Sequence, residues 1–418
     1  MKFVAQTANI FRRNSRLQQF VFLADRSIEL LQGNLELKII ILLKITIGYD
    51  FDIEQYECTD LLKYYHAVEE ILDDSVVEKK FRTTILLKIG KAYILTANYR
   101  KTLEYTLKAE KITNEIKDIE TEALCCQTLG IAYCHLGAYK KAITYFAKGL
   151  EISSAIENRL GIASDNGNLG NVYLSLAEYD KAITYYEKGL EMSTATGDRS
   201  GIASNNGNLG NAYLSLGEYD KAITYYEKGL EISSATGDRS GIACNIGNLG
   251  NVFLSLGEYD KAIWYYEKGL EISSAIGDRS GIATSNGNLG NAYLRLGEYH
   301  KAITYYEKGL EMSSAIGDRS GIASNIGSLA NGYLNLGKYH KAITYYVKGL
   351  EISSAIGDRS GIASSNGNLG NAYLNLGEYD KAITYYEKGL EISSAIGHRS
   401  GIAINKRNLG NAYRELGE

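Results

Sequence analysis

The sequence predicts an all-α protein, a solenoid built from antiparallel pairs of helices. A unit of forty residues recurs along the chain, and residues 201–240 differ from residues 361–400 at only four positions. Self-similarity with a period of about 20–50 residues is typical of solenoids, propellers and repeat arrays. Apolar residues inside the unit recur three and four positions apart, which is the spacing of one helix face, and strand-like alternation does not persist. The 418 residues include no proline, which excludes proline-rich linkers.

Each unit divides into two helices, as residues 201–240 illustrate. Each helix carries an apolar stripe at helical spacing; the stripes consist of Ile202, Leu209, Tyr213 and Leu216, and of Tyr219, Ala222, Ile223, Tyr226 and Leu230. Gly217 and Gly237 stand where the helices are expected to end, at positions that favour a positive φ. Asp238 is suited to cap the N-terminus of the next helix.

Tyrosine supplies 34 of the 43 aromatic residues. We expect Tyr213 and Tyr226 to form the core between the two helices, and Tyr225 to face a neighbouring unit or solvent. An alternative is that the repeated tyrosines line a ligand cage. Small residues on one flank of the first helix would let another helix approach closely, at a cost of about 1 kcal/mol in helix propensity for each glycine; they are Ala203, Gly207 and Gly210.

The repeat divides the chain into four predicted segments. They are an N-terminal helical segment at 1–34, degenerate helical repeats at 35–120, seven forty-residue units at 121–400, and an incomplete terminal repeat with a first helix only at 401–418. Leu409, Tyr413 and Leu416 would then lack the second helix that covers them. We therefore expect this end to be frayed, paired with another copy, or truncated.

Charge and cysteine usage limit the functional classes. A formal charge of -4 does not suit a duplex nucleic-acid binder, which needs a basic field. Five cysteines without C-x-x-C spacing indicate a reduced, cytoplasmic protein. No apolar stretch reaches the ~20 residues that span a bilayer. Residues 1–24 are basic, and they form either an amphipathic first helix or a mitochondrial targeting segment.

The motif Leu209-Gly210-x-x-Tyr213, followed by Ala222-x-x-x-Tyr226, resembles the tetratricopeptide repeat. Two departures are Asn206 in place of the expected tryptophan and the missing late proline. The forty-residue length and the Gly-Asp-Arg joint are similar to the variant in LGN/Pins-type adaptors and in the arrays of CHAT-domain proteins. The resemblance is strong over 121–418 and weak over 35–120, and it implies a right-handed superhelix whose first helices line a concave groove.

A polar stripe lies opposite the core face of the first helix, about 210° from Ile202. In residues 201–240 it contains Ser204, Asn208, Asn211 and Ser215. An asparagine amide offers two donors and one acceptor, which match the backbone of an extended peptide. Alternatively, these asparagines form a solvated face, or some of them bond between neighbouring units. The predicted peptide-binding asparagines are Asn168, Asn171, Asn208, Asn211, Asn248, Asn251, Asn288, Asn291, Asn331, Asn368, Asn371, Asn408 and Asn411.

Cations interrupt this stripe at a few places. Lys88 and Lys91 occupy the two asparagine positions of the unit that starts at residue 81, and Arg295 occupies the position of Ser215. They would suit acidic side chains or a ligand carboxylate, so we expect a somewhat acidic peptide. The alternative is that they are ordinary solvated cations.

Signals for catalysis or a cofactor are lacking in the sequence. The five histidines have no metal-ligand spacing. Cys125, Cys126 and His135 fall in one predicted helix, which does not favour a thiol–imidazole pair. The repeated Gly-Asn-Leu-Gly lies inside a helix and follows no strand, so it is not a phosphate loop. We predict no enzyme activity, no cofactor and no metal.

The sequence therefore predicts a non-enzymatic interaction scaffold or adaptor that binds extended peptide segments of partner proteins in its groove. The LGN/Pins resemblance implies a role in G-protein, cytoskeletal or spindle-orientation signalling. Two alternatives stay open. One is a self-associating structural array that pairs through its C-terminal end, and the other is the sensor arm of a longer CHAT-type effector protein.

Overall fold

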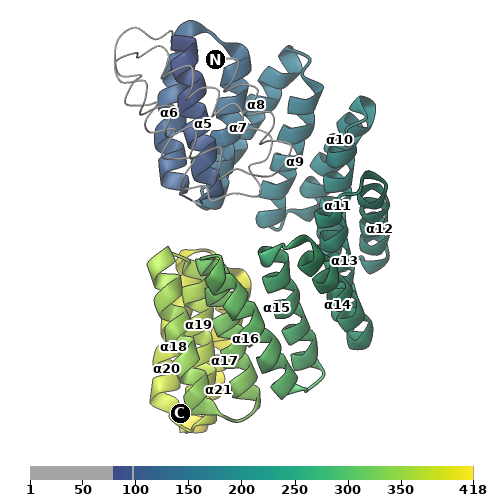
Figure 1. Cartoon of the computed structure of the whole chain (residues 1–418). Helices are drawn as coiled ribbons and strands as arrows, with labels where there is room; N and C mark the ends of the chain where they lie inside the picture. Colours follow the sequence, from purple (N-terminus) through teal and green to yellow (C-terminus); the bar gives the residue numbers. More distant parts are fainter. Residues whose placement is uncertain (1–78, 97, 418) are drawn as a thin grey trace, which may run out of the picture. The chain divides into compact units, whose positions relative to one another are not determined.

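The computed structural model describes residues 79–96 and 98–417, which form 17 helices and no strand. The predicted all-α architecture is confirmed for this part of the chain (Figure 1). Consecutive helices are joined by only two or three residues, as in antiparallel helical hairpins. The predicted N-terminal segment 1–34, and residues 35–78 of the predicted degenerate repeats, lie outside the described residues.

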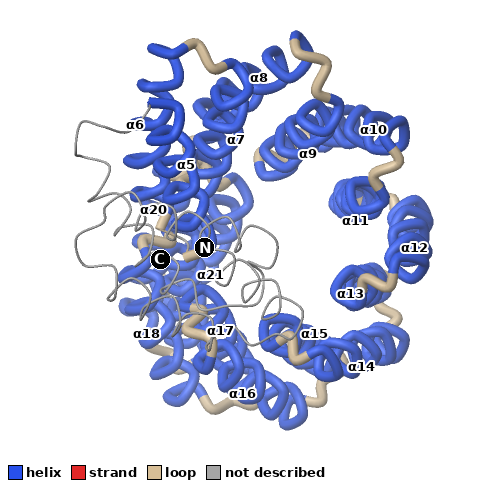
Figure 2. Tube along the Cα trace, turned by 45° about the horizontal axis from the view of Figure 1, so that its top comes forward, coloured by secondary structure: helices blue, strands red, loops and turns tan. Residues whose placement is uncertain are grey.

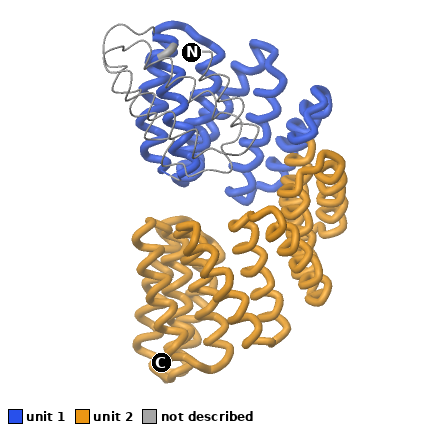
Figure 3. The backbone as a smooth tube through the Cα atoms, in the orientation of Figure 1, with its two compact units in different colours: residues 1–201 blue, residues 202–418 orange. Residues whose placement is uncertain are grey.

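The chain divides into two compact units, residues 1–201 and 202–418 (Figure 3). The helices described in the first unit are α5 (Lys79–Leu95), α6 (Tyr99–Ile116), α7 (Ile119–His135), α8 (Tyr139–Ala155), α9 (Arg159–Ser175) and α10 (Tyr179–Thr196). Helix α11 (Arg199–Leu216) crosses the boundary. The second unit continues with α12 (Tyr219–Thr236), α13 (Arg239–Ser255), α14 (Tyr259–Ile276), α15 (Arg279–Arg295), α16 (Tyr299–Ala315), α17 (Arg319–Asn335), α18 (Tyr339–Ile356), α19 (Arg359–Asn375), α20 (Tyr379–Ala395) and α21 (Arg399–Leu416).

The predicted helix ends are confirmed in the repeat at 201–240. Gly217 and Gly237 have φ values of 77° and 73°, in the region that favours glycine. The side chain of Asp238 accepts a hydrogen bond of 3.0 Å from the backbone N–H of Gly241, and so it caps α13. These helix boundaries can be predicted from the sequence because each one depends on a capping residue next to it.

The hydrophobic core joins each repeat to the next one. Ala262 and Tyr266 of α14 pack with Leu289 and Ala292 of α15, and all four are at most 1% exposed. The same arrangement joins α8 to α9 and α20 to α21. Since the second helix of one repeat buries its apolar face on the first helix of the next, stability depends on contacts between neighbours.

The odd-numbered and even-numbered helices of the second unit form two layers. From α11 to α16, the odd-numbered helices lie on the inner side of the curve and the even-numbered helices on the outer side (Figure 2). Successive odd-numbered helices also contact one another directly, as α13 does with α15 and α15 with α17. The polar stripe of the first helices therefore belongs to the inner layer.

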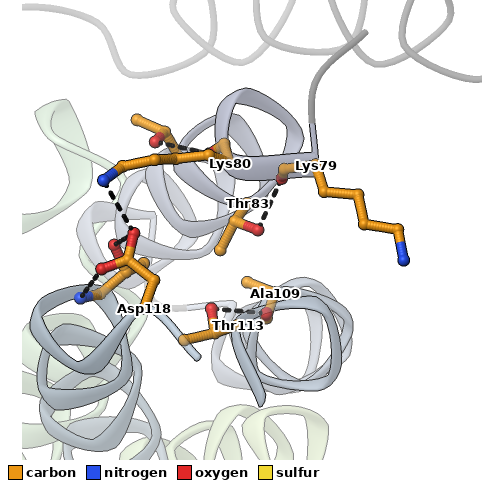
Figure 4. A network of polar contacts seen from close by, with 8 residues as sticks. Lys79, Lys80, Thr83, Ala109, Thr113 and Asp118 are labelled. Atoms are coloured by element: carbon orange, nitrogen blue, oxygen red, sulfur yellow. Dashed lines mark hydrogen bonds and ion pairs between the residues drawn. The ribbon is translucent and has the colours of Figure 1, made fainter. Parts of the chain in front are cut away.

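A polar contact joins α5 to α7, and others lie within α5 and α6 (Figure 4). Lys80 of α5 lies 3.3 Å from Asp118, whose side chain caps α7 by accepting from the backbone N–H of Thr121. Thr83 and Thr113 donate to carbonyls four residues earlier in their own helices, at 2.9 Å. One carboxylate thus connects α5 to the start of α7.

In six of the described first helices, a glycine receives an aromatic ring of the second helix of the same repeat. A Cβ on Gly250 would lie 2.6 Å from Cε1 of Tyr266, so only a glycine leaves room for the ring in its present position. The equivalent glycines that meet a ring in the same way are Gly130, Gly170, Gly210, Gly290 and Gly370. In one repeat the glycine is replaced by Ala330. The same repeat has Gly332 two residues further on, where the other repeats have alanine or valine. By contrast, no atom lies within 4 Å of a Cβ built on Gly247.

These two glycines of α13 make a matched pair for a stability test. We expect Gly250→Ala to destabilise the protein by about 1–2 kcal/mol, because the new methyl group displaces the Tyr266 ring. We expect Gly247→Ala to stabilise it by about 0.5–1 kcal/mol through helix propensity. Urea unfolding followed by circular dichroism measures both changes, and an equal gain in the two variants would contradict the packing described above.

Candidate functional site

The predicted asparagines form two series that differ in their environment. The first series consists of Asn168, Asn208, Asn248, Asn288, Asn368 and Asn408, and the second of Asn171, Asn211, Asn251, Asn291, Asn331, Asn371 and Asn411. All members of the first series are half-buried except Asn408, which is buried. Among the described residues, the amides of Asn168, Asn208, Asn288 and Asn368 form no hydrogen bond within the protein. The protein therefore leaves most of the first series able to bond to a ligand.

Six of the seven members of the second series, all except Asn411, are anchored to the core tyrosines of the following helices. The hydroxyl of Tyr226 in α12 donates to Oδ1 of Asn211 in α11 at 2.7 Å. The same bond, at 2.5–2.8 Å, joins Tyr186 to Asn171, Tyr266 to Asn251, Tyr306 to Asn291, Tyr346 to Asn331, and Tyr386 to Asn371. Sequence reasoning missed this contact. The signal was present, because each tyrosine follows its asparagine by fifteen residues.

The tyrosine bond fixes the orientation of six amides of the second series, all except that of Asn411. Burial raises the pKa of all six tyrosines, and that of Tyr386 to about 12, so the hydroxyls remain protonated donors near neutral pH. Oδ1 of the asparagine accepts this hydrogen bond, and the Nδ2 group keeps two N–H donors. The second series therefore offers donors rather than acceptors to a ligand.

One bond joins the two series across neighbouring repeats. Nδ2 of Asn408 in α21 donates to Oδ1 of Asn371 in α19 at 3.1 Å, and this oxygen also accepts from Tyr386. The alternative that some of the asparagines bond between neighbouring units is thus correct for this pair.

The predicted cations lie in different compact units. Lys88 is half-buried and Lys91 is exposed, both on α5. Arg295 is exposed at the end of α15 and lines an open pocket of about 370 Å³ with Tyr259 and the turn at 254–257. Within this pocket Arg295 is the one charged residue, beside Leu254, Ser255, Leu256, Gly257 and Tyr259.

A third group of asparagines is buried, which sequence reasoning did not foresee. Asn206 and Asn245 are at most 5% exposed, and each donates to the backbone carbonyl four residues earlier at 2.8 Å. Their Oδ1 atoms have no hydrogen-bond partner. Oδ1 of Asn245 instead packs against Gly229 of α12, where a Cβ would lie 2.8 Å away. These residues belong to the repeat interface and not to the candidate binding surface.

Two of the three cysteines of α7 lie in the core. Cys125 and Cys126 are fully buried, and burial raises the pKa of each thiol to about 12, so neither is a nucleophile near neutral pH. His135 stacks on Tyr99 with ring centroids 4.4 Å apart. In the part of the chain that the structure describes, no group of histidine, cysteine or carboxylate side chains is arranged to hold a metal ion.

Comparison with known families and structures identifies the repeat. The model of the tetratricopeptide repeat matches residues 120–195 and, in overlapping stretches, 201–275, 241–315, 281–355, 321–393 and 361–418. The chain belongs to the tetratricopeptide repeat family. No curated protein matches it as a relative.

Several solved tetratricopeptide structures share the fold. A Rap protein complexed with competence and sporulation factor is 15% identical, with a TM-score of 0.59, over 86% of this chain and 99% of that one. The apo form of the quorum sensor NprR from B. thuringiensis is 18% identical, with a TM-score of 0.56, over 84% and 98%. A signal transduction ATPase from Pyrococcus horikoshii with a tetratricopeptide sensor is 17% identical, with a TM-score of 0.50, over 93% and 67%. At these identities the likeness shows the fold.

The tetratricopeptide helices are amphipathic rather than apolar throughout. Among the described residues, none of the helices combines the length and the hydropathy that crossing a membrane requires.

The interface between α8 and α9, which belong to neighbouring repeats, contains a buried carboxyl group. Asp165 of α9 is fully buried, and its Oδ2 accepts a hydrogen bond of 3.2 Å from Ser153 of α8. A Cβ on Gly149 of α8 would lie 3.2 Å from both carboxyl oxygens. Burial raises the pKa of Asp165 to about 7. The equivalent residues in other repeats are neutral, namely Asn205, Asn245, Ser285, Asn325, Ser365 and Asn405.

This carboxyl group should make stability depend on pH. Because the pKa is higher in the folded protein than in the unfolded chain, the folded form binds more protons between about pH 4 and 7. Stability conferred by the neutral carboxyl is therefore lost as the pH rises through this window, and a difference of about three units amounts to on the order of 4 kcal/mol.

We expect Asp165→Asn to remove this loss, since asparagine fills the same position in four other repeats. The measurement is urea unfolding at pH 4 to 8 for the wild type, for Asp165→Asn, and for the control Asp180→Asn on the exposed first turn of α10. As the pH rises from 4 to 8, the free energy of unfolding should fall equally in the wild type and the control, and it should fall much less in the Asp165→Asn variant. Equal pH profiles for all three proteins would show that Asp165 is not protonated in the folded protein.

Proposed function

We propose that the protein is a non-enzymatic scaffold that binds an extended peptide segment of a partner along the odd-numbered helices of residues 202–418. Tetratricopeptide arrays are typical protein-interaction scaffolds. The observation that carries the proposal is the repeated pair of asparagines on this layer. In three of these pairs one amide has no hydrogen bond within the protein and the other is oriented by a core tyrosine; they are Asn208 with Asn211, Asn288 with Asn291, and Asn368 with Asn371.

The two series have complementary roles in this proposal. An amide of the first series, such as that of Asn288, accepts from a peptide N–H or donates to a peptide C=O. An amide of the second series, such as that of Asn291, directs its N–H donors to peptide carbonyls, because Tyr306 engages its oxygen. A preorganised donor loses less rotamer entropy on binding. Contacts of this kind involve the peptide backbone, so they would tolerate many ligand sequences.

An excess of donors also supports a preference for acidic segments. A carboxylate accepts hydrogen bonds from amide N–H groups, and the exposed cations nearby favour negative charge. In the second unit the exposed cations include Arg295 on α15 and Lys406, Arg407 and Arg414 on α21. We place this scaffold in cytoplasmic signalling, as the LGN/Pins resemblance suggests, with a partner that is an acidic, extended peptide.

The comparisons give a second candidate, in which the array is the sensor of a larger signalling protein. The P. horikoshii protein of this fold is a signal transduction ATPase with a tetratricopeptide sensor, and the Rap protein was solved with competence and sporulation factor. A sensor array and an adaptor array would use the same binding face. The two candidates differ in the consequence of binding: an adaptor holds its partner, whereas a sensor regulates the rest of a larger signalling protein.

Removing four amides of the first series tests the proposal. We expect Asn208→Ala, Asn248→Ala, Asn288→Ala and Asn368→Ala together to leave the helical circular dichroism signal intact, because these half-buried side chains lie outside the core clusters. At ~1 kcal/mol per lost hydrogen bond, peptide affinity should fall by a factor of about 10²–10³. The ligands are peptides selected on the wild type from a random twelve-residue display library, and calorimetric titration gives the dissociation constants.

The control makes the same number of changes on the opposite layer. Thr224, Thr304, Thr344 and Thr384 are exposed on even-numbered helices, and their hydroxyls bond only to carbonyls of their own helices. Their joint replacement by alanine should leave affinity within about threefold of the wild type. If the asparagine variant stays folded and keeps the wild-type affinity, the odd-numbered layer is not the binding face.

A further inference from the structure

Trp264 breaks the repeat on the even-numbered layer. It is the one tryptophan of the sequence, and 55% of it is exposed on α14. Threonine holds the equivalent position in the other repeats from residue 121 onward, at Thr144, Thr184, Thr224, Thr304, Thr344 and Thr384. Each of these hydroxyls bonds to the backbone carbonyl four residues earlier, so the position is designed for a small side chain facing solvent. A large exposed ring at such a position adds nothing to the packing between repeats.

The tryptophan also changes the contacts of its neighbours. Its ring lies 4.9 Å from that of Tyr265 at an interplanar angle of 87°. In five other repeats a lysine lies over the equivalent tyrosine ring, with Nζ 4.9–5.6 Å from the centroid; these are Lys188, Lys228, Lys308, Lys348 and Lys388. The equivalent Lys268 pairs with Glu271 at 3.0 Å. Tyr265 therefore contacts the indole of Trp264 and lacks the lysine that lies over the equivalent tyrosine in those five repeats.

Negative charge flanks the exposed ring. Asp260 and Glu267 stand four residues before and three residues after Trp264, which places all three on one face of the helix, and both carboxylates are exposed. The lysines of this face are already paired, Lys261 with Glu258 and Lys268 with Glu271. Helix α12 repeats the acidic pair as Asp220 and Glu227, whereas His300 and His340 replace the aspartate on α16 and α18. The surface around Trp264 is thus acidic as well as aromatic.

We propose that Trp264, Asp260 and Glu267 form a docking site for a basic segment of a protein partner, with an arginine of that segment stacked on the indole. A guanidinium group fits both elements of the site, because it stacks on aromatic faces and donates to carboxylates. Tryptophan and arginine are also the residues that most often dominate the affinity of an interface. This site lies on the layer opposite the two asparagine series, and its partner chemistry is the reverse of theirs.

The tryptophan itself provides the assay. Because the sequence has one tryptophan, intrinsic fluorescence excited at its absorption edge reports on this site alone. A random twelve-residue display library is selected on the full chain and depleted on Trp264→Thr, which restores the residue of the other repeats. The recovered peptides are synthesised and titrated against the wild type, Trp264→Thr, Asp260→Asn with Glu267→Gln, and the matched control Asp220→Asn with Glu227→Gln on α12.

The expected result is a set of arginine-rich peptides that shift the emission of the wild type. Their affinity should fall at least ~30-fold in Trp264→Thr, which corresponds to a dominant interface residue. It should fall about 5–10-fold in the Asp260 and Glu267 variant, with a weaker salt dependence, and change little in the α12 control. The four-asparagine variant described above should bind these peptides normally, which separates this site from the proposed peptide surface.

Three outcomes would overturn the proposal. They are the recovery of no peptide after depletion, the recovery of peptides without arginine or lysine, and equal affinities for the wild type and Trp264→Thr.

Discussion

The contact on which most repeats depend is the insertion of a tyrosine from the second helix beside a glycine of the first helix. Gly210 leaves room for the ring of Tyr226, and Oδ1 of the next residue, Asn211, accepts a hydrogen bond of 2.7 Å from the tyrosine hydroxyl. In the repeat at 241–280 the same ring also reaches the following repeat, because Tyr266 packs with Leu289 and Ala292. One side chain therefore holds the hairpin together, joins it to its neighbour and orients an amide of the candidate binding surface.

Much of this architecture could be predicted from the sequence, because it depends on local patterns. The glycine ends at 217 and 237, the aspartate cap at 238 and the buried Tyr226 all follow from helical spacing and capping chemistry, and the structure confirms them. Tyr225 could not be placed in the same way. It stacks on Tyr213 at 5.3 Å within its own repeat, which depends on how the two helices cross rather than on either helix alone.

The candidate site was predicted at the level of residue type but not of environment. Asn206, Asn208 and Asn211 lie within six positions on one helix, yet they are respectively buried, half-buried and bonded to a core tyrosine. Helical spacing predicts the direction in which each side chain leaves the helix. Neighbouring helices then determine what that side chain contacts. Asn206 shows the consequence, because its buried Oδ1 has no partner and this costs stability that the surrounding packing must outweigh.

A repeated surface and a residue that occurs once suit different kinds of recognition. A partner backbone presents the same N–H and C=O groups at every residue, so a surface that repeats the same amides, as Asn208, Asn248 and Asn288 do, is suited to recognise it regardless of sequence. Discrimination between partners requires a feature that occurs once. Trp264 is such a feature, and it stands among carboxylates on the even-numbered layer, where it disturbs neither the core tyrosines nor the asparagines. An array of near-identical repeats can thus add specificity by a single substitution on its outer helices, because the contacts that hold the repeats together lie elsewhere.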